Sequence, residues 1–135
     1  MIHTASRQIA EHIEFLYGRP HAELEAHAES TTHPNMLSAL LAAHGAIEFA
    51  ERDLDFQLQR LRKLTQPERE VGRYDAGHIY DCARRIGEAV AVRDTQARHV
   101  SAVLQSLHRT PAPEATPAAL VAPPVLAAAP ATRAR

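Results

Sequence analysis

Residues 37–64 read LSALLAAHGAIEFAERDLDFQLQRLRKL, and this stretch decides the fold. Large apolar residues recur in it every three or four positions, which is the period of one face of an α-helix. Two lines of positions spaced by seven residues describe that face, the first wholly apolar and the second polar at its middle. The lines are Leu40, Ile47, Leu54, Leu61 and Leu37, His44, Glu51, Leu58, Thr65. With a start in the connector before Leu37, the spacing predicts a helix of roughly 31 residues that ends near Leu64 and is about 46 Å long at 1.5 Å per residue.

The same pattern resumes from Ile79 to Leu107, in the lines Ile79, Ile86, Arg93, Val100, Leu107 and Ala83, Val90, Ala97, Leu104. Between the two stretches, Thr65 and Glu68 have the spacing of a capping box. The helix that starts there is expected to break between Gly72 and Gly77, where Asp75 is able to cap a restart. Because the two helical stretches have nearly equal lengths, they predict an antiparallel hairpin.

Folding this hairpin places Leu37 and Leu40 against Leu104 and Leu107 at one end. Near mid-length it brings Glu51 close to Arg93, and the opposite charges predict an ion pair across the hairpin. The alternative is that both side chains reach solvent at the edge of the seam.

The segment before the hairpin predicts two shorter helices. One runs from Thr4 to Tyr17, with Ile9, Ile13 and Leu16 on one stripe and Gly18 at its end. Pro20 then suits the first turn of an exposed helix through Ser30. Thr32 or Asn35 is placed to cap the long helix that follows. We therefore expect an all-α fold: a long antiparallel helical hairpin with a shorter N-terminal helix packed on it, in a domain of residues 1–109.

Residues 110–135 form an Ala/Pro-rich segment that holds six of the nine prolines. This composition is typical of a disordered tail with polyproline II character. A spacer is the simpler interpretation, and a short docking motif around Leu120-Val121 and Val125-Leu126 is the alternative.

Composition and charge narrow the classes of function. With no Trp, three Phe and three Tyr, the core is thin, and small domains with thin cores are often stabilised by association. Residues 1–59 carry nine acidic residues against three Arg, whereas 60–109 carry ten basic residues against six acidic ones. The net charge of −1 argues against a dedicated nucleic-acid binder.

Other features of the composition bear on location and source. Cys82 is the only cysteine and is expected to be buried. The N-terminus lacks the apolar core of a signal peptide, and no run is long enough to span a bilayer, so we expect a cytoplasmic protein without membrane contact. Fourteen Arg against one Lys, with abundant Ala and Pro, indicate a high-GC bacterial genome.

Nine histidines raise the possibility of a metal site. His44 and Glu48 lie one helical turn apart, as do Glu23 and His27, and His78 lies near Asp81. The chain nevertheless lacks the His-x3-His helix of haemerythrin-like bundles and the Glu-x-x-His repeats of ferritin-like carboxylate sites. We therefore expect surface histidines, with no metal-binding, cofactor-binding or catalytic residues. A pH response centred on His44 is a further hypothesis.

A basic cluster near the hairpin turn is a candidate nucleic-acid surface; it comprises Arg60, Arg62, Lys63, Arg69, Arg73, Arg84 and Arg85. Interleaved acidic residues favour a solvated helix face instead. The sequence thus favours a non-catalytic helical interaction or oligomerisation module, a coiled-coil-like bundle that forms a homo-oligomer or binds a protein partner through helix faces. The alternatives are a His/carboxylate metal-binding bundle and a regulatory protein that contacts nucleic acid.

Overall fold

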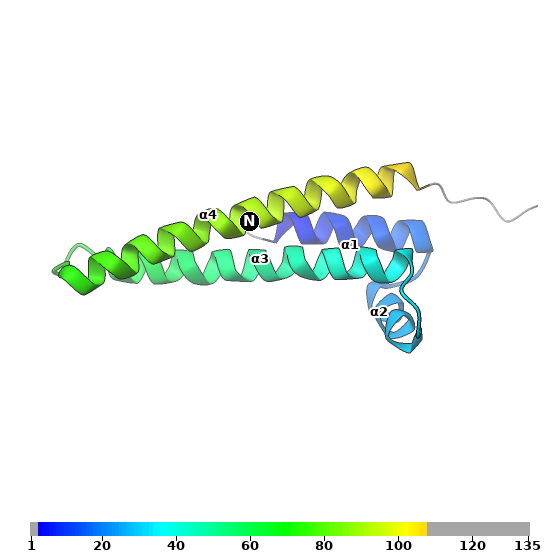
Figure 1. Cartoon of the computed structure of the whole chain (residues 1–135), viewed down its shortest axis with the longest axis horizontal. Coiled ribbons are helices and arrows are strands. Elements are labelled where there is room, and N and C mark those ends of the chain that lie inside the picture. The colour runs from blue at the N-terminus through cyan, green and yellow to red at the C-terminus, as the bar shows by residue number, and fades with distance from the viewer. Residues whose placement is uncertain (1–2, 108–135) are drawn as a thin grey trace, which may run out of the picture.

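The computed structural model describes residues 3–107, and the predicted tail at 110–135 lies outside them. The described chain is all-α, with helices α1 (Thr4–Tyr17), α2 (His21–Ser30), α3 (Met36–Leu64) and α4 (Arg73–Ser106). The long helices α3 and α4 run antiparallel, and α1 lies along them at the end away from their turn (Figure 1). α2 crosses that same end at a steep angle to α3 (Figure 1). The predicted fold class is confirmed.

The main core lies where three helices meet. With 14 residues against the 29 of α3, α1 covers only about half of the hairpin. The core cluster lies at this three-helix end, and it comprises Ile9, Ile13, Leu24, Leu37, Leu40, Ile47, Val100 and Leu104. Leu107 packs against the same cluster, so the predicted meeting of Leu37 and Leu40 with Leu104 and Leu107 is confirmed. Toward the turn, α3 and α4 contact each other without α1 beside them (Figure 1).

Local sequence signals mark the end of α1 and the start of α3. Gly18 adopts φ 67° and its N–H donates to the Glu14 carbonyl at 2.7 Å, which ends α1 as predicted. The Asn35 side chain accepts from the Ser38 N–H at 2.9 Å, so Asn35 rather than Thr32 caps α3.

The connection between α3 and α4 corrects one prediction. Thr65 does not cap a new helix; its hydroxyl donates to the Leu61 carbonyl, and α3 ends there. α4 begins at Arg73, and the Asp75 carboxylate accepts from the Gly72 N–H at 3.1 Å. The expected restart near Asp75 is therefore the true start of the helix. No break follows at Gly77, because α4 is continuous to Ser106.

Two predictions about the hairpin seam are also corrected. Ala83 is exposed, and the neighbouring Cys82 is buried in its place, with a fully covered side chain. Glu51 and Arg93 do not form the predicted ion pair. Arg93 contacts Asp94, its neighbour in sequence, at 2.8 Å, and Glu51 contacts α1. The seam therefore carries no charged layer of the predicted kind.

Candidate functional site

The buried Glu51 carboxylate caps α1 from the neighbouring helix. One carboxylate oxygen accepts from the backbone N–H groups of Ala5 and Ser6, at 3.1 and 3.2 Å. The other accepts from the Ser6 hydroxyl and lies 3.4 Å from His3 Nδ1. The residue before α1, His3, provides no side-chain cap of its own. A negative charge from α3 therefore satisfies the positive end of the α1 dipole, which fixes where α1 docks.

His44 and His21 form the centre of a polar groove beside this contact. The buried His44 ring and the His21 ring, which α2 delivers, meet edge to face with centroids 4.5 Å apart. The groove has a volume of about 300 Å³ and is also lined by His3 and Glu48. Sequence reasoning singled out His44 and Glu48 but missed His21 and His3, which come from other elements of the chain.

Burial lowers the pKa of His44 below its ordinary value. The neighbouring His21 acts in the same direction, whereas Glu48, a hydrogen bond with the Ser6 backbone, and Glu25 oppose the shift. His44 is therefore held in its neutral form more strongly in the folded chain than in the unfolded chain.

This lowered pKa predicts a loss of stability on acidification. As pH falls below about 6.5, the unfolded chain binds the His44 proton before the folded chain does. The stabilising contribution is thus complete above about pH 6.5 and declines as pH falls toward the folded-state pKa. We expect the free energy of unfolding to decrease from about pH 7.5 to about pH 5.5, with a smaller decrease for His44→Gln. Urea unfolding across this range measures both slopes.

The exposed His99 provides the control, because His99→Gln leaves the contact between His44 and His21 intact. It is expected to keep the slope of the unmodified chain. An equal slope for His44→Gln and the unmodified chain would show that His44 does not set the pH response.

Three members of the other two candidate metal-ligand pairs contact arginines. His78 Nδ1 accepts from Arg60 at 3.2 Å, and Asp81 contacts three arginines. Glu23 lies 3.9 Å from Arg19. Between residues 3 and 107, no group of three or more His, Cys, Asp or Glu side chains is arranged to hold a metal ion.

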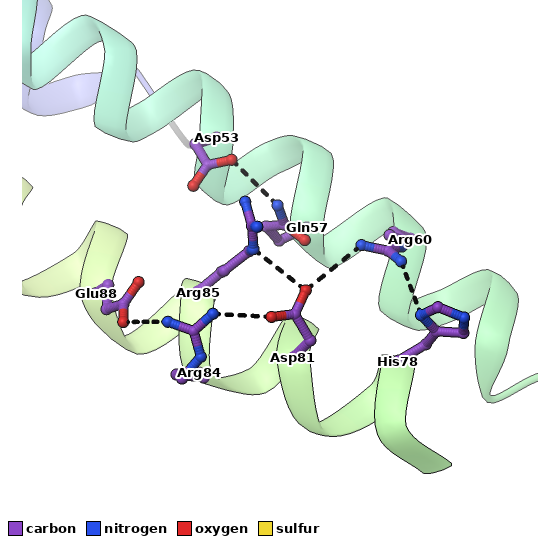
Figure 2. A network of polar contacts seen from close by, with 8 residues as sticks. All are labelled: Asp53, Gln57, Arg60, His78, Asp81, Arg84, Arg85 and Glu88. Atoms are coloured by element: carbon purple, nitrogen blue, oxygen red, sulfur yellow. Dashed lines mark hydrogen bonds and ion pairs between the residues drawn. The ribbon is translucent and has the colours of Figure 1, made fainter. Parts of the chain in front are cut away.

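The basic residues near the hairpin turn form an ion-pair network with acidic neighbours (Figure 2). The Asp81 carboxylate lies 2.9 Å from the Arg84 guanidinium and 3.2 Å from that of Arg85. The Arg60 guanidinium, on α3, lies 3.8 Å from the same carboxylate. The hydrogen bond from Arg84 and the charges of these arginines lower the pKa of Asp81. Glu88 neutralises Arg84 from its other side. Much of the positive charge weighed as a nucleic-acid surface is thus paired within the chain.

The outer face of α3 presents two aromatic side chains to solvent. Phe49 is 67% exposed and Phe56 is 61% exposed. They are seven residues apart, which places them on one side of the helix, and Arg52 and Asp53 lie between them. Phe49 is about 200° around α3 from Glu51, so it points away from α1. We call these four residues the outer face: Phe49, Arg52, Asp53 and Phe56.

The hairpin register places one exposed apolar residue of α4 level with this face along the helix axis. Arg60 of α3 contacts Asp81 of α4, which fixes the register of the two helices. Because the helices are antiparallel, counting the same number of residues toward the start of α3 and toward the end of α4 brings Phe49 level with Val92. Val92 is 45% exposed. Sequence reasoning followed the apolar seam and missed this face, although the spacing of the two Phe residues was a readable signal.

Comparisons of the chain with protein-family models, with curated proteins and with solved structures gave no match. Within the described residues, no helix combines the length and apolar character that crossing a membrane requires.

Proposed function

We propose that this chain is a non-catalytic helical interaction module that docks on another protein surface through the outer face of α3. The observation that carries the proposal is the exposure of Phe49 and Phe56 on one side of a long helix. Aromatic side chains are enriched at protein interfaces because each brings a large apolar area with few rotatable bonds. An apolar pair with this spacing suits a helix packed lengthwise against another helix.

The thin core of the hairpin favours association in general, through residues that lie away from the outer face. Toward the hairpin turn, Leu54, Leu64, Cys82 and Ala89 are buried, and Leu58, Leu61, Ile79 and Ile86 are only half-buried. A third helix covers the hairpin at its other end only. Packing against an external helix would remove further apolar area from water, at about 25 cal/mol per Å².

A photoreactive amino acid in place of Phe56 tests this role in the full chain, inside the cells that produce it. We expect irradiation to yield one discrete cross-linked species, because a docked partner lies in contact with this side chain. Phe15 provides the control, since it is 75% exposed but lies on α1. The same substitution there is expected to leave the chain uncrosslinked.

Two results would contradict the proposal. The first is no cross-link at position 56, which would mean that nothing docks there. The second is equal cross-linking at positions 15 and 56, which would mean that the contact is nonspecific.

A further inference from the structure

We propose that the surface that docks on the outer face is a second copy of this chain, packed antiparallel along α3 about a two-fold axis between Arg52 and Asp53. This inference rests on the proposed function of the face and names its partner. It follows from the order of the side chains along α3 and from two charges that find no ion-pair partner among the described residues.

The outer face is complementary to itself under this symmetry. In an isologous contact, if residue i of one copy meets residue j of the other, then j also meets i. A two-fold axis between residues 52 and 53 sets Phe49 of one copy against Phe56 of the other. The same operation sets Arg52 against Asp53, so apolar meets apolar and positive meets negative at once. Antiparallel helices packed about 8–10 Å apart bring these side chains within reach.

The two charges at the centre of the face have no ion-pair partner among residues 3–107. Arg52 is exposed and forms none. Asp53 is half-buried and accepts one hydrogen bond, from Gln57 at 3.2 Å (Figure 2). By contrast, Arg60, Arg84 and Arg85 all contact Asp81 within the chain. A second copy supplies each unpaired charge with its opposite, and the face carries one charge of each sign.

Charge exchange between Arg52 and Asp53 tests the arrangement while keeping both Phe residues. In the Arg52→Glu variant, each interface contact joins two acidic groups, and in the Asp53→Arg variant each joins two basic groups. We expect either variant alone to dimerise about 10- to 100-fold more weakly than the unmodified full chain at low ionic strength. In an equal mixture, every contact again joins opposite charges, so we expect a mixed dimer close to the original strength.

Sedimentation velocity measures the dissociation constants, and far-UV circular dichroism checks that each variant retains its helices. Arg98→Glu is the control, because Arg98 is exposed on α4 and away from the outer face. It is expected to leave the dissociation constant unchanged.

Three results would overturn the inference: a chain that is monomeric at every concentration, a dimer insensitive to both charge changes, or a mixture that does not recover. A monomeric chain that still cross-links from position 56 in cells would exclude the second copy as partner and leave the docking role intact. A monomeric chain that does not cross-link there would remove both.

Discussion

Replacement of Glu51 by Ala is expected to destabilise the fold by about 2–4 kcal/mol, the largest loss we predict for a single polar side chain. The Glu51 carboxylate is fully buried and accepts from two backbone N–H groups and from the Ser6 hydroxyl. Removing it leaves those donors in a buried site without their acceptor and takes away the negative charge at the start of α1. For a domain of this size, the loss corresponds to a fall in melting temperature of about 10–20 °C.

Two variants separate capping from simple loss of side-chain volume. Glu51→Gln keeps an oxygen acceptor and removes the charge, so it is expected to cost less, about 1–2 kcal/mol. Glu48→Ala removes an exposed carboxylate from the same helix and is expected to change stability by less than about 0.5 kcal/mol. Urea unfolding at fixed protein concentration measures all three. If Glu51→Ala unfolded at the same urea concentration as Glu48→Ala, the account of the α1 cap would fail.

The spacing of apolar residues and the residues at helix ends predict most of the fold. The three- and four-residue spacing in α3 and α4 predicts the hairpin, because a helix with one apolar stripe must bury that stripe against another element. Gly18 and Asn35 mark helix ends through local backbone chemistry, which depends on nearby residues only. These features can be predicted from the sequence because their physical causes lie within a few residues of each other.

The hydrogen-bond partners of Glu51 could not be predicted from the sequence, because they lie far from it along the chain. Its place on the seam predicts burial but does not say which helix supplies the donors. Arg93 was the obvious partner by charge, yet the start of α1 lies closer and offers N–H groups that would otherwise lack an acceptor. Likewise, His21 reaches His44 only because α2 turns across the end of the bundle, an angle that no spacing in the sequence encodes.

The outer face was missed because exposed apolar residues have no packing partner within the described residues that a core pattern could reveal. Phe49 and Phe56 fall outside both apolar lines of the hairpin, so the search for a core passes them by. Their exposure in the folded chain is what identifies them. In general, large apolar side chains that the fold leaves outside its core are the ones to examine for docking.

The double variant Phe49→Glu/Phe56→Glu is expected to dissociate the dimer almost completely. Each substitution removes a large apolar side chain from the interface and would place a carboxylate in an apolar contact, where an unpaired charge is strongly disfavoured. Because both positions are exposed in the single chain, the helical fold itself is expected to remain. We expect the dissociation constant to rise by at least about 100-fold.

Phe15→Glu tests whether added negative charge alone has this effect, since Phe15 is at least as exposed but lies on α1. It is expected to leave the association unchanged. Circular dichroism of both variants verifies that any change in mass is not caused by unfolding.

Sedimentation equilibrium of the purified full chain beside the Phe49→Glu/Phe56→Glu variant is the most direct test of this account. We expect the unmodified chain to sediment at twice its 14.8 kDa mass and the folded variant to sediment at the mass of one chain. An unmodified chain that is monomeric at all concentrations, or a dimer that the variant retains, would contradict it.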